Sequence, residues 1–156
     1  MTEFNITKTK SLVLEHKLRV LTYLSRFINN LLARAVIHDD SKLTVPELEP
    51  YATVIDEFGK HPFGSEGYEQ IKSQLQGAIT HHYENNRHHP EHFENGINDM
   101  DLVDLLEMLA DWKAATLNKG GNGDIHKSIS MLSEKYGINP QLSQILSNTV
   151  KNFGLS

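Results

Sequence analysis

Hydrophobic residues recur at intervals of three and four along most of the chain, which is the spacing that places them on one face of an α-helix. The first such stretch runs from about Lys8 to Ile37. Its apolar positions are Leu14, Leu18, Leu21, Leu24, Ile28, Leu31, Leu32 and Ala35. A break is predicted at Asn29-Asn30, because asparagine is a poor residue for the interior of a helix.

Further helices are predicted at about 44–58, 65–82, 100–118, 124–136 and 140–152. Thr44-Val-Pro-Glu47 has the pattern of a capping box with proline in the first turn. Asn98 or Asp99 is expected to cap the helix at 100–118, which Gly120-Gly121 ends. Asn139 caps the last helix, with Pro140 at its first position. The buried side of the helix at 100–118 is predicted to carry Leu102, Leu105 or Leu106, Leu109, Trp112 and Ala115.

The same pattern predicts the fold class and the domain organisation. No segment alternates with a period of two, as a half-buried strand would, so the class is all-α. Residues 59–64 and 83–97 are read as loops. We find no internal repeat and no Pro/Ser-rich linker, so residues 1–156 are predicted to form one compact domain of six to seven helices. Its core spans about 12–118, and helices at about 124–152 complete it.

Composition narrows the classes of function. The chain has 156 residues, no cysteine, and 15 Lys+Arg against 20 Asp+Glu, for a net charge of −5. The absence of cysteine excludes a disulfide scaffold, a thiolate metal site and a cysteine nucleophile. A weakly acidic chain is a poor candidate for broad binding of duplex nucleic acid. No apolar run approaches the ~20 residues of a membrane span, and the N-terminus lacks a secretory pattern, so the cytoplasm is predicted (the host's, for a phage protein).

Histidine is the unusual residue of this chain. Five of the nine histidines fall within twelve residues, at His81, His82, His88, His89 and His92. Neutral imidazole binds divalent transition metals, and carboxylates complete such a shell. A metal site is therefore one interpretation of the segment, and a solvated histidine-rich loop is the other.

Four further residues are candidates when they are taken together with that segment. His38-Asp39 follows the first helix, His16 lies in the middle of that helix, and Asp111 adjoins Trp112 in a very apolar helix. An unpartnered carboxylate there would be costly. In one continuous helix, His16 and His38 would be about 33 Å apart. A site that uses both residues therefore predicts a turn near Asn29-Asn30 and a helical hairpin.

The order of these residues resembles the HD-domain superfamily of metal-dependent phosphohydrolases. The HD-GYP branch of that superfamily is matched by HDDSK at 38–42, HHYEN at 81–85 and DWKAA at 111–115. The GYP tripeptide itself is absent, and Leu12 stands where that branch has a carboxylate. The chain resembles more closely a family of small phage and bacterial proteins with HDxSK, HH, HHP and EMxxDWxA motifs, which has no known reaction.

The resemblance implies a centre with one or two divalent metal ions, of Mn, Fe, Mg, Co, Ni or Zn. The implied ligands of the first metal are His16, His38, Asp39 and Asp111. A second metal would be held by Asp39 with His81 or His82, and by His88 or His89. The implied catalytic residues are Lys42, Asp39 and Glu107, with Lys42 on a phosphate oxygen and Glu107 orienting a ligand histidine. The implied substrate contacts are Lys42, Arg87 and Asn86.

The function that follows from the resemblance is hydrolysis of a nucleotide or another small phosphate ester by a metal-activated water. Two alternatives remain open at this point. One is a non-catalytic module that binds a nucleotide or a protein, and the other is a di-iron oxygenase on the same scaffold. Neither duplex nucleic acid nor a membrane is expected as a partner, and a homodimer through the helices at 124–152 is left open.

Overall fold

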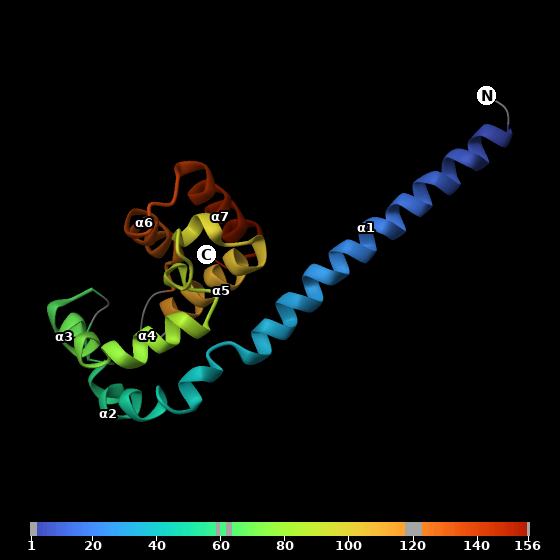
Figure 1. The fold of residues 1–156 in the computed structure, drawn as a ribbon. Coiled ribbons are helices and arrows are strands. Elements are labelled where there is room, and N and C mark those ends of the chain that lie inside the picture. Colours follow the sequence, from blue (N-terminus) through green and yellow to red (C-terminus); the bar gives the residue numbers. More distant parts are fainter. Residues whose placement is uncertain (1–2, 59, 62–63, 118–122, 156) are drawn as a thin grey trace. The chain divides into compact units, whose positions relative to one another are not determined.

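The computed structural model describes residues 3–58, 60–61, 64–117 and 123–155 (Figure 1). The described residues are helical and contain no strand, so the predicted all-α class is confirmed. The α-helices are α1 (Glu3–Ile37), α2 (Leu48–Phe58), α3 (Glu66–Gln74), α4 (Gln76–Asn85), α5 (Leu102–Leu117), α6 (Ile125–Lys135) and α7 (Pro140–Asn152). Three 3₁₀ helices join them: η1 (Asp40–Leu43), η2 (Pro90–His92) and η3 (Gly96–Asp99). None of the described helices is both long enough and apolar enough to cross a lipid bilayer.

The chain divides into two compact units, Met1–Ile37 and His38–Ser156. In the described part of the first unit, α1 is one unbroken helix of 35 residues. The break predicted at Asn29-Asn30 is therefore wrong, and so is the helical hairpin that depended on it. An interior asparagine costs a helix less than about 0.7 kcal/mol, which is too little to interrupt so long a run of helix-forming residues.

The capping box predicted at Thr44-Val-Pro-Glu47 is not formed, and α2 begins only at Leu48. The hydroxyl of Thr44 donates to the carbonyl of Ser41, and the amide of Glu47 donates to the carbonyl of Thr44. The side chain of Glu47 is fully buried and contacts two histidines of α4. A residue that the pattern assigned to a helix cap therefore belongs to the interior.

The predicted helix at 65–82 is two helices, because α3 ends at Gln74 and α4 begins at Gln76. The cap of α5 also differs from the prediction. Asp101 accepts hydrogen bonds from the amides of Val103 and Asp104, whereas Asn98 and Asp99 lie in η3. The buried face of α5 is Val103, Asp104, Glu107, Met108, Leu109 and Trp112, while the predicted core residues Leu102 and Ala115 are exposed. This face includes two acidic residues, Asp104 and Glu107, which were not among the positions predicted to be buried.

Two hydrophobic clusters hold the second unit together. Val54, Ile71, Leu75 and Ile79 join α2, α3 and α4. Met108, Leu109, Trp112, Ile125, Ile129, Leu132, Ile138, Leu146 and Val150 join α5, α6 and α7. The segment that contains η2 leads from the first group of helices to the second (Figure 1). The predicted end of the 100–118 helix at Gly120-Gly121 lies outside the described residues.

The predicted cap of α7 is confirmed, since the side chain of Asn139 accepts a hydrogen bond of 2.9 Å from the amide of Leu142. Asn139→Ala is expected to lower the free energy of unfolding by about 1 kcal/mol, because an amide of the first turn loses its partner. Urea unfolding measures the change. Asn148→Ala, on the exposed side of the same helix, should change it by less than about 0.5 kcal/mol. Equal effects of the two substitutions would contradict the role of the cap.

Candidate metal centre

Asp39 occupies an unusual backbone position near the start of the second unit. Its φ of 62° is in the left-handed region, and among the described residues it is the only non-glycine with a positive φ. Aspartate tolerates this conformation better than most residues, at a cost of about 1–2 kcal/mol. Asp39 precedes η1, but its carboxylate makes no capping hydrogen bond there. The side chain is thereby available for other contacts.

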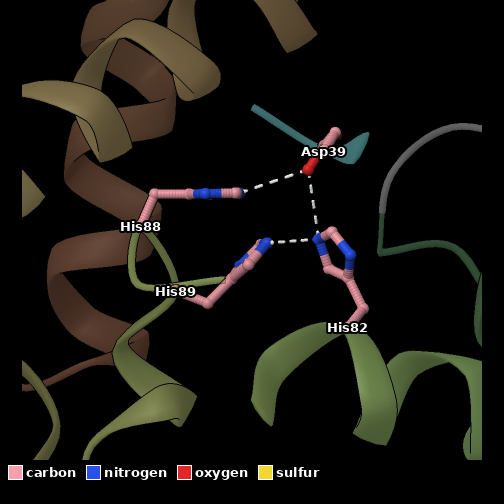
Figure 2. A group of neighbouring side chains, drawn as sticks. All are labelled: Asp39, His82, His88 and His89. Atoms are coloured by element: carbon pink, nitrogen blue, oxygen red, sulfur yellow. Dashed lines mark hydrogen bonds and ion pairs between the residues drawn. The ribbon is translucent and has the colours of Figure 1, made fainter. Parts of the chain in front are cut away.

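Three histidines converge on the carboxylate of Asp39 (Figure 2). His82 comes from α4, and His88 and His89 come from the segment that precedes η2. Oδ1 of Asp39 lies 3.2 Å from Nε2 of His82 and 3.4 Å from Nε2 of His88. Nε2 of His89 lies 2.9 Å from Nε2 of His82. We call these four residues the His cage.

The spacing of the His cage fits a metal ion. Four ligands at 2.0–2.1 Å from a tetrahedral ion are separated by about 3.3–3.4 Å, close to the distances that surround Asp39 Oδ1. Asp39 Oδ1 and His88 Nε2 are both buried and have no hydrogen-bond partner among the described residues. A buried polar atom without a partner costs free energy, and a cation shared by the four residues would satisfy both atoms.

Glu47 fixes which nitrogen of His82 enters the His cage. Its Oε2 accepts a hydrogen bond of 2.9 Å from Nδ1 of His82, and its Oε1 accepts one of 2.7 Å from Nδ1 of His81. A carboxylate only accepts hydrogen bonds, so Nδ1 of each ring carries the hydrogen. In the neutral ring, Nε2 of His82 then presents a lone pair to the His cage. A carboxylate behind a metal-binding imidazole is a common arrangement in metalloproteins.

Glu107 contacts the Nδ1 atoms of His38 and His88, as Glu47 contacts those of His81 and His82. Its Oε1 accepts a hydrogen bond of 2.9 Å from Nδ1 of His38, and it lies 3.3 Å from Nδ1 of His88. The rings of His38 and His88 are tilted by 38° to each other, with 4.2 Å between their centroids. Nε2 of His38 points to two carboxylates, at 3.8 Å from Asp39 Oδ2 and 3.7 Å from Asp111 Oδ1. Asp39 thus presents one oxygen to the His cage and the other to His38.

These contacts shift the pKa of three groups. Burial alone would raise the pKa of Asp39, but His82, His88 and Lys42 hold it well below its usual range. Burial beside His88 and His82 lowers the pKa of His89 to about 2, which keeps that ring neutral and able to act as a ligand. The pKa of His38 is raised to about 9, chiefly by Asp111, with Glu107 and Asp39 adding to the effect and burial opposing it.

Lys42 is the cation nearest to Asp39 in the described contacts. Its Nζ donates a hydrogen bond of 2.6 Å to Oδ2 of Asp39, three residues earlier in the chain. The short 3₁₀ helix η1 places residues three apart on one side, which brings the two side chains together. The side chain of Lys42 is 36% exposed, so the ammonium also faces solvent. An ammonium has three donors, and two remain for an incoming anion.

The two predicted substrate contacts near the histidines make other contacts within the second unit. Both Nε and a terminal nitrogen of Arg87 donate to the carboxylate of Asp104, at 3.0 and 2.8 Å. The amide of Asn86 donates to Ser41 Oγ and to the carbonyl of His82. These contacts tie the histidine segment to α5 and η1. Binding of substrate by Arg87 and Asn86 stays a prediction.

Arg87→Leu is expected to lower the free energy of unfolding by about 2–3 kcal/mol. The substitution removes both guanidinium hydrogen bonds from the fully buried carboxylate of Asp104, which keeps the amide of Asp101 as a donor. Urea unfolding measures the loss, and elemental analysis should find the metal content unchanged. A stable variant that has lost only affinity for a phosphate ester would instead identify Arg87 as a substrate contact.

The structure brings together most of the residues nominated from the sequence: His38, Asp39, Lys42, His82, His88, His89, Glu107 and Asp111. His81 turns its Nδ1 to Glu47 and is absent from the described groups of potential ligands. His16 lies in α1, 21 residues or about 32 Å along the helix from its end at Ile37. Its role as a ligand stays a prediction.

Sequence reasoning missed Glu47 and Asp104 as buried partners of site residues. Both are fully buried. Glu47 was hidden because the Thr44–Glu47 spacing has a second, more common meaning as a helix cap. Asp104 was not recognised because Asp104, Glu107 and Asp111 are three and four residues apart on α5, which is also the spacing of a solvent-exposed acidic helix face.

Comparison with known proteins identifies a family for this chain. A protein-family model matches residues 5–152, and the family is described as one of unknown function. No curated protein and no solved structure matches the chain. The function therefore has to be argued from the residues of the site.

Proposed function

The chain belongs to the DUF5662 family, whose function is unknown, and we propose that it is a metal-dependent hydrolase of small phosphate esters. One observation carries the proposal. Asp39 Oδ1 and the Nε2 atoms of three histidines converge at ligand spacing, and two of these atoms lack another partner among the described residues. Asp39 precedes η1, His82 lies in α4, and His88 and His89 precede η2, so a single local turn does not account for the arrangement.

The donor set favours particular metals. Three imidazoles and one carboxylate suit Zn, Fe, Co, Ni or Mn better than Mg, which prefers a shell of oxygen ligands. Glu47 accepts the Nδ1 hydrogen of His82, and Glu107 lies 3.3 Å from Nδ1 of His88; a carboxylate behind a metal-binding imidazole makes that imidazole more basic. We therefore propose a transition-metal ion in the His cage.

A divalent ion held there supplies Lewis acidity and an activated water near neutral pH. The chain itself supplies the remaining groups. Asp39 and the three histidines fix the position of the ion, and Lys42 directs its two remaining N–H donors to a phosphate oxygen. His38 and Asp111 border Asp39 on the side of Oδ2, where the protonated imidazole of His38 can donate a proton and the carboxylate of Asp111 can accept one.

Two features support a phosphate ester as the substrate class. Lys42 is a half-exposed cation next to the carboxylate that would hold the ion. The order of the motifs resembles that of the HD-domain phosphohydrolases. The substrate is expected to be a small molecule, such as a nucleotide, since the net charge of −5 disfavours a duplex.

The test begins with elemental analysis of untagged protein and of His82→Ala, with circular dichroism as the check of folding. We expect one or more equivalents of a transition metal in the parent, and less than a tenth of that amount in the variant. His126→Ala is the matched control, because His126 is exposed and lies on α6. An equal metal content in the parent and His82→Ala would contradict the proposed centre.

The second step assays the metal-loaded protein with an aryl phosphate and a panel of nucleotides. Hydrolysis of at least one of them is expected, with kcat/KM at least 100-fold lower in His82→Ala. A loaded protein that hydrolyses none of the panel would contradict the reaction but leave the metal centre in place. Substrate-dependent uptake of oxygen by an iron-loaded protein would instead favour the oxygenase alternative.

A further inference from the structure

We propose that Lys42 takes the place of a second metal ion, so that the protein binds one divalent ion per chain. This inference rests on the proposed metal centre and concerns its stoichiometry. It starts from the two oxygens of Asp39, which have different surroundings. Oδ1 faces the His cage, whereas Oδ2 faces Lys42 and His38.

Three side chains at and beside Oδ2 have the chemistry of metal donors, although together they are not one of the described groups whose ligand atoms all lie within 4.8 Å of one another. Nε2 of His38 lies 3.8 Å from Asp39 Oδ2 and 3.7 Å from Asp111 Oδ1. One imidazole and two carboxylates are a sufficient protein shell for a divalent ion that keeps some of its waters. A carboxylate that bridges two metals, with one oxygen on each, is a familiar arrangement in hydrolases. The donor types alone would therefore be compatible with a second ion.

Lys42 changes that expectation. Its Nζ lies 2.6 Å from Asp39 Oδ2, which is the distance of a charge-assisted hydrogen bond. The ammonium thus uses the oxygen that a second ion would need, and it adds a positive charge next to the place where that ion would bind. The backbone of η1 holds Lys42 on the same side as Asp39. The ammonium adds a formal charge of +1 to the centre, whereas a second divalent ion would add +2.

In the experiment, metal-free protein is titrated with Mn²⁺ and with Zn²⁺. Calorimetry measures the affinity and the stoichiometry, and elemental analysis measures the metal that stays bound. One equivalent is expected in the parent and two in Lys42→Met, with affinity for the second ion at least 10-fold above that of the parent. Lys42→Arg keeps the charge and should bind one. Lys60→Met is the matched control, because Lys60 forms the same i, i+3 pair with Glu57 on an exposed surface. The Mn²⁺ electron paramagnetic resonance spectrum should change from that of an isolated ion to that of a coupled pair in Lys42→Met only.

The outcomes separate this inference from the metal centre. Two equivalents in the parent, or one in both the parent and Lys42→Met, would overturn the role of Lys42 and leave the His cage intact. Two equivalents in Lys42→Arg would show that the charge is not what excludes the second ion, and would also overturn it. Absence of binding by every protein would overturn the proposed centre together with the inference.

Discussion

Metal binding is expected to raise the free energy of unfolding by about 4 kcal/mol when the free metal concentration is about 1,000 times the Kd. The reason is that the ligands come from three segments that only the folded chain brings together. Asp39 precedes η1, His82 lies in α4, and His88 and His89 precede η2. Urea unfolding in the presence of a chelator or of added metal measures the difference, and for a chain of this length the Tm should rise by roughly 8–16 °C.

Asp39→Asn is the sharpest control for this stabilisation. Asparagine also tolerates the left-handed backbone at φ 62°, so the fold of the metal-free protein should be retained. The amide has no charge and is a weaker ligand, so we expect the metal affinity to fall at least 100-fold. At the same metal concentration, the stabilisation then drops from about 4.1 to about 1.4 kcal/mol. Undiminished stabilisation in Asp39→Asn would place the bound metal outside the His cage.

The helices could be predicted from the sequence because their signals are local. Apolar spacing and capping residues located most of the helices of the second unit to within a few residues, and Asn139 with Pro140 gave the start of α7. The errors have a common cause in competition between local signals and tertiary contacts. Two asparagines did not break α1, because many helix-forming neighbours offset their small free-energy cost.

The site could be predicted only in part. Residue type and order identified His38, Asp39 and the two histidine pairs as candidate ligands. Sequence alone did not distinguish His81 from His82. Adjacent residues on a helix point in different directions, and only the tertiary packing decides which of the two side chains is buried. In the structure, Nε2 of His82 enters the His cage, and Glu47 contacts both rings.

Glu47→Gln is expected to lower the metal affinity 10- to 100-fold, which is the usual effect of losing a carboxylate behind a metal-binding histidine. Glutamine has nearly the shape of glutamate, but its amide offers one acceptor oxygen and one donor nitrogen. The Nδ1 hydrogens of His81 and His82 both need an acceptor. One of the two rings must therefore turn or shift its hydrogen to Nε2. For His82, that shift would place a hydrogen where the lone pair for the metal should be.

Calorimetric titration of Glu47→Gln with Zn²⁺ measures this effect, and two other variants make it specific. Glu49→Gln makes the same change on an exposed residue of α2, and its affinity should equal that of the parent. His81→Ala removes the competing donor and leaves Glu47 to His82 alone, so the affinity should fall less than 10-fold. If Glu47→Gln binds Zn²⁺ as tightly as the parent, Glu47 does not orient His82, and its burial serves only the packing of the residues before α2 against α4. If His81→Ala loses as much affinity as Glu47→Gln, His81 is itself a ligand, and the choice of His82 alone is wrong.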